Sequence, residues 1–190
     1  MSVPTLHLAS SSPRRKEILC ALGLTFSAAG VEADERRLKG ESAEAMALRL
    51  AVAKVKSAAT DESRIVLAAD TVVALGERIF GKPQDCTDAI DMLEALSGQT
   101  HRVLTGVAVQ AQEGIRTALS ATEVKFREIR PDEALAYWQS GEPCDKAGAY
   151  AIQGLGGVFV EAISGSYSGV VGLPVFETVQ LLRDAGLRVL

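Results

Sequence analysis

Residues 65–75 read Ile-Val-Leu-Ala-Ala-Asp-Thr-Val-Val-Ala-Leu, an almost continuous apolar run with one acid, Asp70, near its middle. A run of this kind, without polar alternation, is typical of a strand that is buried on both faces. A carboxylate inside such a strand is costly unless it is paired or binds a cation. We therefore predict a functional role for Asp70, as a metal ligand or a general base. The alternative is a strand end or bulge where Asp70 meets solvent.

Strand and helix patterns alternate on both sides of this run. Further strands are predicted over 5–9, 25–29, 78–80, 102–111, 121–129 and 158–163, and helices over 42–59, 87–96 and 174–185 and from Pro131 through Trp138. Another helix is expected to begin at Ser12-Pro13, with Ser12 as its cap, and to end at Gly23. Short turns between the middle strands favour antiparallel pairs there. The sequence thus predicts an α/β fold with a mixed sheet, in a single domain spanning 1–190.

Composition and charge exclude several classes of protein. The chain of 190 residues carries a net charge of −4, which argues against binding to a nucleic-acid polymer or an anionic membrane surface. No apolar run approaches the roughly 20 residues that span a bilayer, and the first residues do not resemble a signal peptide. Three widely spaced cysteines argue against a disulfide framework or a zinc site. A cytoplasmic protein is expected.

A polar cluster, Ser10-Ser11-Ser12-Pro13-Arg14-Arg15, follows the first predicted strand and opens a helix. Helix N-termini favour anions, and arginine matches phosphate oxygens with two parallel hydrogen bonds. The cluster therefore fits an anion site, but it fits equally well a plain helix cap with solvated arginines.

Two further features are open to two interpretations. Lys54 shares a helix face with Ala47 and Leu50, so its ammonium either points into a cleft or extends to solvent from the edge of the core. The segment 144–154 places Asp145, Lys146 and Gln153 among glycines and small residues. Such a segment suits a binding surface or an ordinary turn.

Taken together, these features resemble the Maf family of nucleotide pyrophosphatases. The matching segments are Ser10 to Arg15, Asp34-Glu35, Lys54, Ala68 to Val73, Gly81-Lys82-Pro83, Leu96-Ser97-Gly98 with His101, Asp145 to Tyr150 with Ile152-Gln153-Gly154, and Gly172-Leu173-Pro174. They span nearly the whole chain in the family's order. The resemblance is strongest to the branch that hydrolyses dTTP and UTP to the monophosphate and pyrophosphate.

The resemblance implies a fold similar to inosine triphosphate pyrophosphatases, with an elongated mixed sheet, flanking helices and two lobes around a cleft. It implies a divalent cation (Mg²⁺ or Mn²⁺), a cytoplasmic location and a homodimer. Asp70 matches the family's proposed catalytic base, and Arg14, Thr71 and Gln153 match positions linked to substrate choice. The residues Val31-Glu32-Ala33 vary from the family pattern, which leaves open whether Asp34 or Glu35 does the work there.

The residues also fit this chemistry without the resemblance. Glu35 and Asp70 offer the hard oxygen ligands that Mg²⁺ and Mn²⁺ prefer, and a triphosphate supplies further oxygens. The expected phosphate-binding groups are Ser10, Ser12, Arg14, Arg15, Lys54 and Lys82. Water activated by Asp70 or by the metal would attack the α-phosphorus, so no covalent nucleophile is required. Two alternatives are a pyrophosphatase for 7-methyl-GTP and a nucleotide-binding regulator without turnover.

Overall fold

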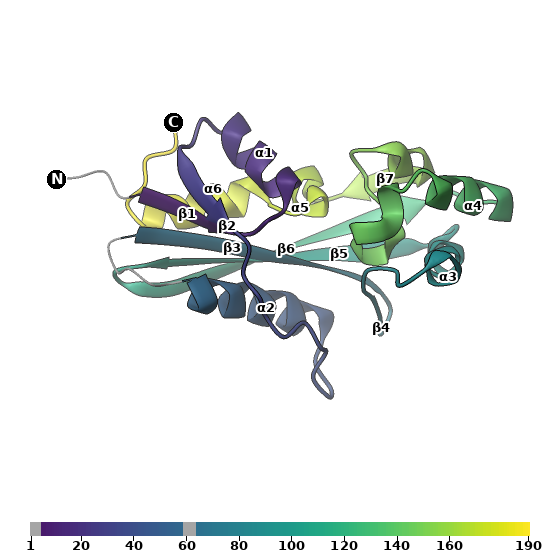
Figure 1. Ribbon diagram of the computed structural model, residues 1–190, viewed down its shortest axis with the longest axis horizontal. Coiled ribbons are helices and arrows are strands. Elements are labelled where there is room, and N and C mark those ends of the chain that lie inside the picture. The colour runs from purple at the N-terminus through teal and green to yellow at the C-terminus, as the bar shows by residue number, and fades with distance from the viewer. Residues whose placement is uncertain (1–4, 59–63) are drawn as a thin grey trace.

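The computed structural model describes residues 5–58 and 64–190, whose strands form one sheet (Figure 1). The strands are β1 (Thr5–Ala9), β2 (Phe26–Ala29), β3 (Arg64–Leu75), β4 (Arg78–Phe80), β5 (Thr100–Ala111), β6 (Gly114–Phe126) and β7 (Val160–Ser164). The helices are α1 (Pro13–Ala21), α2 (Ala43–Ala58), α3 (Cys86–Leu96), α4 (Pro131–Gln139), α5 (Tyr167–Val171) and α6 (Val175–Asp184). Three short 3₁₀ segments, η1 (Glu142–Asp145), η2 (Ala147–Ala149) and η3 (Leu155–Phe159), lie between α4 and β7.

The sheet is mixed, as predicted. Its order is β2-β1-β3-β5-β6-β7, and β4 pairs with the end of β3. Strand β1 runs parallel to β2 and β3, whereas β3, β5, β6 and β7 pair antiparallel along the sheet. The single-sheet α/β architecture with flanking helices is therefore confirmed.

Strand β3 extends further than its parallel neighbour, β1. The pairing with β1 ends at Leu8 opposite Leu67, but β3 continues beside β5 as far as Ala74. After Ala9 the chain leaves the sheet and turns into α1. The β1-facing edge of β3 is therefore open at Asp70 and Thr71, where the C-terminal end of β1 and the N-terminus of α1 meet it.

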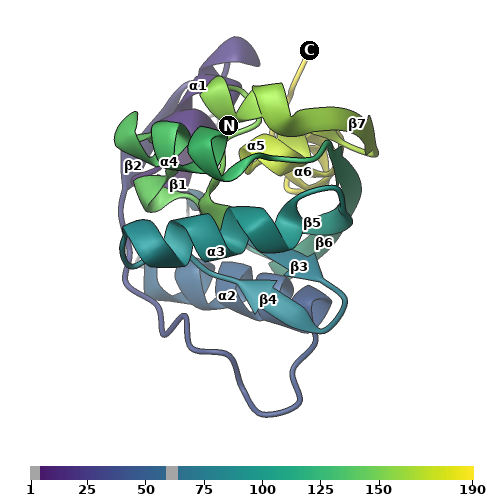
Figure 2. The same cartoon turned by 90° about the vertical axis from the view of Figure 1, so that its right-hand side faces the viewer.

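Helices cover both faces of the sheet. Helix α2 packs on one face, against β3 and β5, while α1, α5 and α6 lie on the other (Figures 1 and 2). Side chains alternate along β3: Val66, Ala68, Val72 and Ala74 belong to clusters on the α2 side, and Ile65, Leu67 and Ala69 pack with α6. Within the described ranges, no helix has the length and apolar character needed to cross a membrane.

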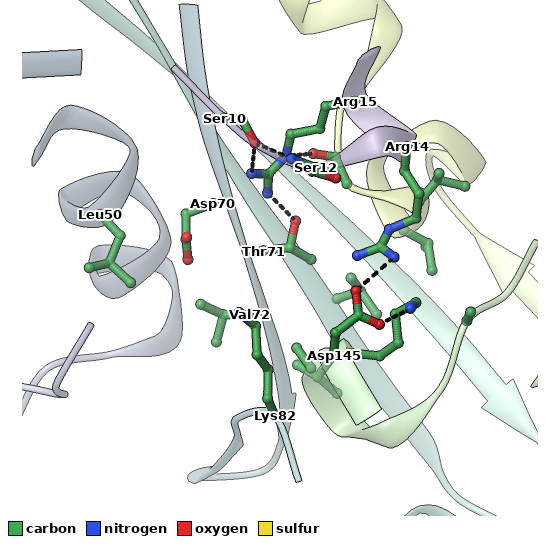
Figure 3. Close-up of a pocket in the computed structure, with 18 of the residues that line it drawn as sticks. Ser10, Ser12, Arg14, Arg15, Leu50, Asp70, Thr71, Val72, Lys82 and Asp145 are labelled. Carbon is green, nitrogen blue, oxygen red and sulfur yellow. Dashed lines mark hydrogen bonds and ion pairs between the residues drawn. The ribbon is translucent and has the colours of Figure 1, made fainter. Parts of the chain in front are cut away.

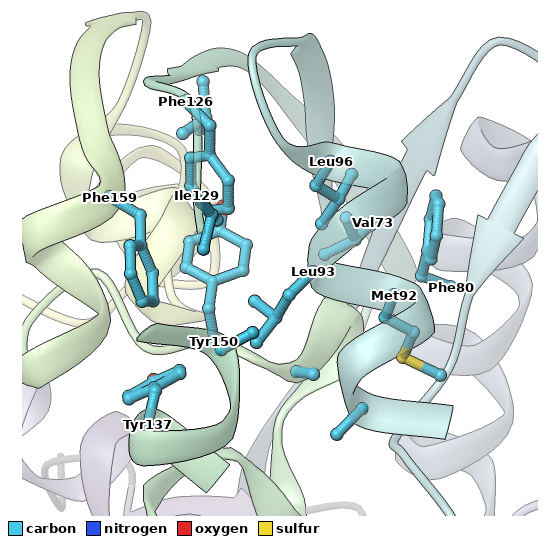
Figure 4. Close-up of a cluster of buried hydrophobic side chains, with 14 of the residues drawn as sticks. Val73, Phe80, Met92, Leu93, Leu96, Phe126, Ile129, Tyr137, Tyr150 and Phe159 are labelled. Carbon is cyan, nitrogen blue, oxygen red and sulfur yellow. The ribbon is translucent and has the colours of Figure 1, made fainter. Parts of the chain in front are cut away.

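A fourth hydrophobic cluster lies at the far end of the sheet, where α3 and α4 lie beside the 3₁₀ segments (Figure 4). Phe126 contacts the ring of Tyr150 edge-on at 4.7 Å between centroids, and Tyr137 contacts Phe159 at 5.2 Å. His101 is buried among them, with Nε2 at 2.9 Å from the Tyr150 hydroxyl. Burial lowers the pKa of His101 to about 4, so its ring is neutral at pH 7 and serves the packing.

Several predicted boundaries differ from the structure. Strand β6 begins at Gly114 rather than 121, because its first half is only partly buried and shows no clear apolar period. It ends at Phe126, three residues before the predicted end. Strand β7 spans Val160–Ser164 rather than 158–163, because η3 occupies the residues before it. Helix α5 was not predicted, since five residues give no helical period.

The predicted helix ends also differ from the structure. Ser12 occupies the N-cap position of α1, as predicted. Its side chain makes no capping hydrogen bond, so the prediction that Ser12 caps the helix through its hydroxyl is wrong. Helix α3 begins at Cys86, where Asp85 accepts a hydrogen bond from the Asp88 amide at 2.9 Å. The helix predicted over 42–59 is α2, and its last predicted residue lies outside the described residues.

Gly106 of β5 lets α2 approach the sheet closely. It lies opposite Asp70 in the register, and a Cβ added to it would lie 2.5 Å from the Ala47 carbonyl oxygen. Only a residue without a side chain fits there, because the obstacle is helix backbone.

We predict that Gly106→Ala lowers the free energy of unfolding by about 1–3 kcal/mol, the usual cost of overpacking a core. Chemical denaturation of the two proteins measures this difference. Gly81→Ala is the control, because a Cβ at Gly81 would meet no atom within 4 Å. Equal losses in the two variants would contradict the close packing of α2.

Candidate functional site

A cleft of about 480 Å³ opens at the free edge of β3. The start of α1, helix α2, strand β3, the turn after β4 and the segment 145–153 line it (Figure 3). Because the β3 edge is open, side chains from both faces of the sheet reach the same cleft. Asp70 points to the α2 side and Thr71 to the side of α1 (Figure 3).

The structure brings every predicted site residue to this cleft. They are Ser10, Ser12, Arg14, Arg15, Glu35, Lys54, Asp70, Thr71, Lys82 and Gln153. In sequence they are spread over more than two thirds of the chain. Ser10, Ser12, Arg14 and Arg15 therefore face a cleft, a placement that suits the predicted anion site.

Asp70 is 8% exposed and lies next to an ammonium group. Its Oδ1 is 2.5 Å from Lys54 Nζ. Burial raises the pKa of the Asp70 carboxyl, and the positive charges of Lys54 and Arg15 oppose that rise. The net direction is upward, so this carboxylate accepts a proton more readily than an ordinary aspartate.

Lys54 joins two carboxylates. Its Nζ is also 2.9 Å from Glu35 Oε1, and its side chain is only 12% exposed. The structure thus directs this ammonium into the cleft rather than out to solvent. Burial raises the pKa of Glu35, but its hydrogen bond with Lys54 and the Lys54 charge outweigh burial, so the net shift is downward and Glu35 is ionised.

The neighbouring acids on this loop differ in their surroundings. Asp34 pairs with Arg36 at 2.6 Å on the surface and does not line the cleft. Of these two acids, Glu35 lines the cleft and Asp34 does not.

The loop that carries Glu35 is fixed by Arg49 of α2, which the sequence did not reveal. Arg49 donates to the Glu41 carboxylate at 2.5 and 2.9 Å, and to the backbone carbonyls of Asp34 and Arg36 at 3.3 and 3.0 Å. The hydrogen bond from Arg49 holds the pKa of Glu41 at about 2. No helical or strand spacing relates these residues, so no local pattern could have linked them.

Arg15 is a partly buried residue that crosslinks three segments. It donates to the Gly172 carbonyl at 2.8 Å, to Ser10 Oγ at 3.2 Å and to Thr71 Oγ1 at 3.5 Å. Burial lowers the pKa of its guanidinium, and the charge of Asp70 opposes that shift. Arg15 therefore ties the start of α1 to β3 and to the end of α5.

Thr71 continues this chain of hydrogen bonds across the sheet. Its Oγ1 lies 3.0 Å from Thr105 Oγ1, and Thr105 donates to the Gly169 carbonyl at 2.8 Å. The hydroxyl of Thr71 is thus already engaged by protein groups.

Arg14 lies at the opposite wall of the cleft from α2 (Figure 3). Its guanidinium is 3.6 Å from the Asp145 carboxylate, which is 63% exposed and also pairs with Lys146. Lys146 lines the cleft, although the sequence analysis assigned it no role. Its signals in the sequence were its place in the glycine-rich segment 144–154 and in the family-matching segment Asp145 to Tyr150.

Lys82 and Gln153 are exposed residues in the lining of the cleft. Their segments are joined where the Gly148 amide donates to the Gly81 carbonyl at 3.0 Å. Within the described part of the chain, the side-chain amide of Gln153 makes no hydrogen bond, so it is available to a ligand.

Comparison with known proteins gives a consistent result. A family model described as "Maf-like protein" matches residues 5–185. A dTTP/UTP pyrophosphatase of Hahella chejuensis is 49% identical over 97% of this chain and 94% of its own length. One of Methylococcus capsulatus is 50% identical over 96% of this chain and 91% of its own.

Among solved structures, the Staphylococcus aureus Ham1 protein aligns with a TM-score of 0.47 at 11% sequence identity. The alignment covers 64% of this chain and 71% of that protein.

Proposed function

The chain belongs to the Maf family, and from this membership and the cleft we propose that it hydrolyses dTTP and UTP to the monophosphate and pyrophosphate. The observation that carries the proposal is the placement of Asp70. Its buried carboxylate, with a raised pKa, lies in a cleft lined by five cationic side chains: Arg14, Arg15, Lys54, Lys82 and Lys146. Relatives with the name dTTP/UTP pyrophosphatase match it at 49 and 50% identity over nearly the full chain.

The phosphates occupy the part of the cleft between α1 and Lys82. The N-terminus of α1 faces this space, with Ser10 and Ser12 beside it, and favours an anion through its dipole. Arg14 is free to turn from the exposed Asp145 to a phosphate oxygen, because a surface ion pair contributes only about 0–1 kcal/mol. Arg15 and Lys54 keep their protein partners and contribute positive charge close to the phosphates.

Asp70 acts as the general base. It takes a proton from a water molecule, the water oxygen attacks the α-phosphorus, and the bond to the bridging oxygen breaks to release pyrophosphate. Lys54 keeps Asp70 oriented and partly offsets the cost of its buried charge. The nearby cations stabilise the negative charge that develops on the phosphate oxygens.

The cleft also fits a divalent cation. The carboxylates of Glu35 and Asp70 both converge on the Lys54 ammonium, so the two acids lie close enough together to share a cation beside it. Among the described residues no three of His, Cys, Asp and Glu cluster for a metal, so phosphate oxygens would have to complete the shell. When bound, Mg²⁺ or Mn²⁺ supplies positive charge to the phosphates, and Glu35 and Asp70 hold it.

Base choice rests on Gln153, with Arg14 and Thr71. A glutamine amide has both a donor and an acceptor, and so matches two groups on the pairing edge of uracil or thymine. Thr71 contributes through its bond with Arg15 rather than through a free hydroxyl. We further propose that the protein works as a cytoplasmic homodimer, without a nucleic-acid or membrane partner.

Replacing Asp70 tests the base. We expect Asp70→Asn to lower turnover by at least about 100-fold, the usual contribution of a positioned general base. We also expect unchanged or greater stability at pH 8. The folded state binds the Asp70 proton more tightly than the unfolded chain does, so this group reduces stability as the pH rises above its ordinary pKa of 3.8. Asparagine removes that loss.

Pyrophosphate release and denaturation curves at pH 5 and pH 8 provide both measurements. Asp34→Asn is the matched control, since that carboxylate pairs with Arg36 outside the cleft. Near wild-type turnover in a folded Asp70→Asn protein would remove Asp70 from the mechanism.

Metal removal tests the cation. We expect EDTA to abolish activity and Mg²⁺ or Mn²⁺ to restore it. Binding of Mn²⁺, followed by electron paramagnetic resonance with a non-hydrolysable UTP analogue, should weaken in Glu35→Gln by about tenfold or more, the effect of losing a ligand or its support. Glu32→Gln, an exposed acid on the same loop, should bind normally. Full activity in metal-free buffer would refute this proposal.

A nucleotide panel tests the substrate. We expect dTTP and UTP to be cleaved at least about 100-fold faster than ATP, GTP or 7-methyl-GTP, because a wrong base leaves polar groups unpaired. Gln153→Ala should reduce that preference without preventing folding. Pyrophosphate release at equal nucleotide concentration gives the result.

The same panel separates the alternatives. A wild-type preference for 7-methyl-GTP would leave the reaction class and overturn the pyrimidine assignment. Nucleotide binding without pyrophosphate release would identify a regulator.

A further inference from the structure

Glu142 lies outside the cleft lining, at the start of η1, yet it is bonded to the loop that carries Gln153. Its two carboxylate oxygens accept hydrogen bonds from the backbone amides of Gly156 and Leu155, each at 3.0 Å. Leu155 and Gly156 are the second and third residues after Gln153.

Tyr137 of α4 completes the network from the other side. Its hydroxyl donates to Glu142 Oε1 at 2.7 Å and accepts from the Ala151 amide at 3.0 Å. Ala151 is the second residue before Gln153. The network therefore ties the loop on both sides of Gln153 and leaves the Gln153 side chain itself untied.

The protonation states suit these bonds. Burial raises the pKa of the Tyr137 hydroxyl, and its bond to Glu142 raises it further, so Tyr137 remains a donor. Burial also raises the pKa of Glu142, but the bonds from Gly156, Tyr137 and Leu155 outweigh it, so the net shift is downward and Glu142 stays ionised. An ionised carboxylate accepts stronger hydrogen bonds than a neutral group.

Close packing fixes the loop against these two side chains. A Cβ on Gly154 would collide with the Glu142 carboxylate, and one on Gly156 would lie 2.5 Å from the Tyr137 hydroxyl oxygen. The Tyr137 ring in turn packs on Phe159 at 5.2 Å between centroids (Figure 4). The loop backbone thus packs directly against Glu142 and Tyr137, and Tyr137 belongs to the buried cluster beside α4.

We propose that Tyr137 and Glu142 are positioning residues that set the base preference of the enzyme by fixing the backbone on both sides of Gln153. This inference rests on the proposed role of Gln153 in reading the base. The physical reason is preorganisation: a glutamine on a fixed loop does not lose loop entropy when it binds, and a base with the wrong pattern cannot be accommodated by loop movement.

The test uses Glu142→Gln and Tyr137→Phe, each of which removes bonds with little change in volume. Glu133→Gln is the matched control, because Glu133 also accepts a hydrogen bond from a backbone amide (Arg130, at 3.0 Å) but makes no hydrogen bond with residues 151–157. We measure kcat and KM for UTP and GTP by pyrophosphate release, and amide hydrogen exchange over residues 151–157.

We expect both variants to reduce the preference for UTP over GTP by about tenfold or more, mainly through a higher KM for UTP, with kcat within about threefold of wild type. Amide exchange over 151–157 should increase, whereas exchange in β5 should not. The control should keep the wild-type preference even where its thermal stability falls. If Glu142→Gln does not fold, Tyr137→Phe carries the test.

A double variant separates positioning from general damage. In the Gln153→Ala background, Glu142→Gln should change the preference no further, because it acts through Gln153. Additive losses in the double variant, or an unchanged preference in a folded single variant, would overturn the proposal. If the wild type prefers a base other than uracil or thymine, only the proposed substrate is refuted. The preference for that base over GTP or UTP, compared between wild type and variants, then tests the positioning role.

Discussion

The ion pair between Lys54 and Asp70 joins helix α2 to the central strand inside the cleft. Both side chains are nearly buried, and the Lys54 charge only partly offsets the cost of burying the Asp70 carboxylate, so the net shift of the Asp70 pKa is upward. The pair forms because Gly106, opposite Asp70, lets the backbone of α2 lie directly on the sheet. Lys54 is seven residues after Ala47, which makes that contact, and therefore lies on the same face of the helix.

The early end of β1 gives this pair access to a ligand. Beyond Leu67, strand β3 has no parallel neighbour, and the chain turns instead into α1. Carboxylates from the α2 side and guanidinium groups from the α1 side thus meet around one open strand edge. Ligands of open α/β sheets bind at such places, outside the carboxyl ends of parallel strands.

Two groups of residues outside the cleft lining hold two of its loops in place. Arg49 and Glu41 fix the loop of Glu35, while Tyr137 and Glu142 fix the loop of Gln153. Both use an ionised carboxylate with several donors, because a loop without regular structure must satisfy its backbone groups in some other way. Glu35 and Gln153, the proposed metal ligand and the proposed base-reading residue, therefore lie on irregular segments whose backbone is held by hydrogen bonds.

The resemblance to the Maf family indicated Glu35, Thr71, Lys82 and Gln153 as site residues. The sequence by itself determined the central buried strand, the anomaly of Asp70 within it and the mixed sheet. These follow from local patterns, since apolar periods and a misplaced charge are visible along the chain. Only the tertiary structure decided that Glu35 rather than Asp34 faces the site, that Arg15 is a crosslink, and that Arg49, Tyr137 and Glu142 support the loops. Those contacts join segments whose spacing follows no helix or strand period, so only the packed chain brings them together.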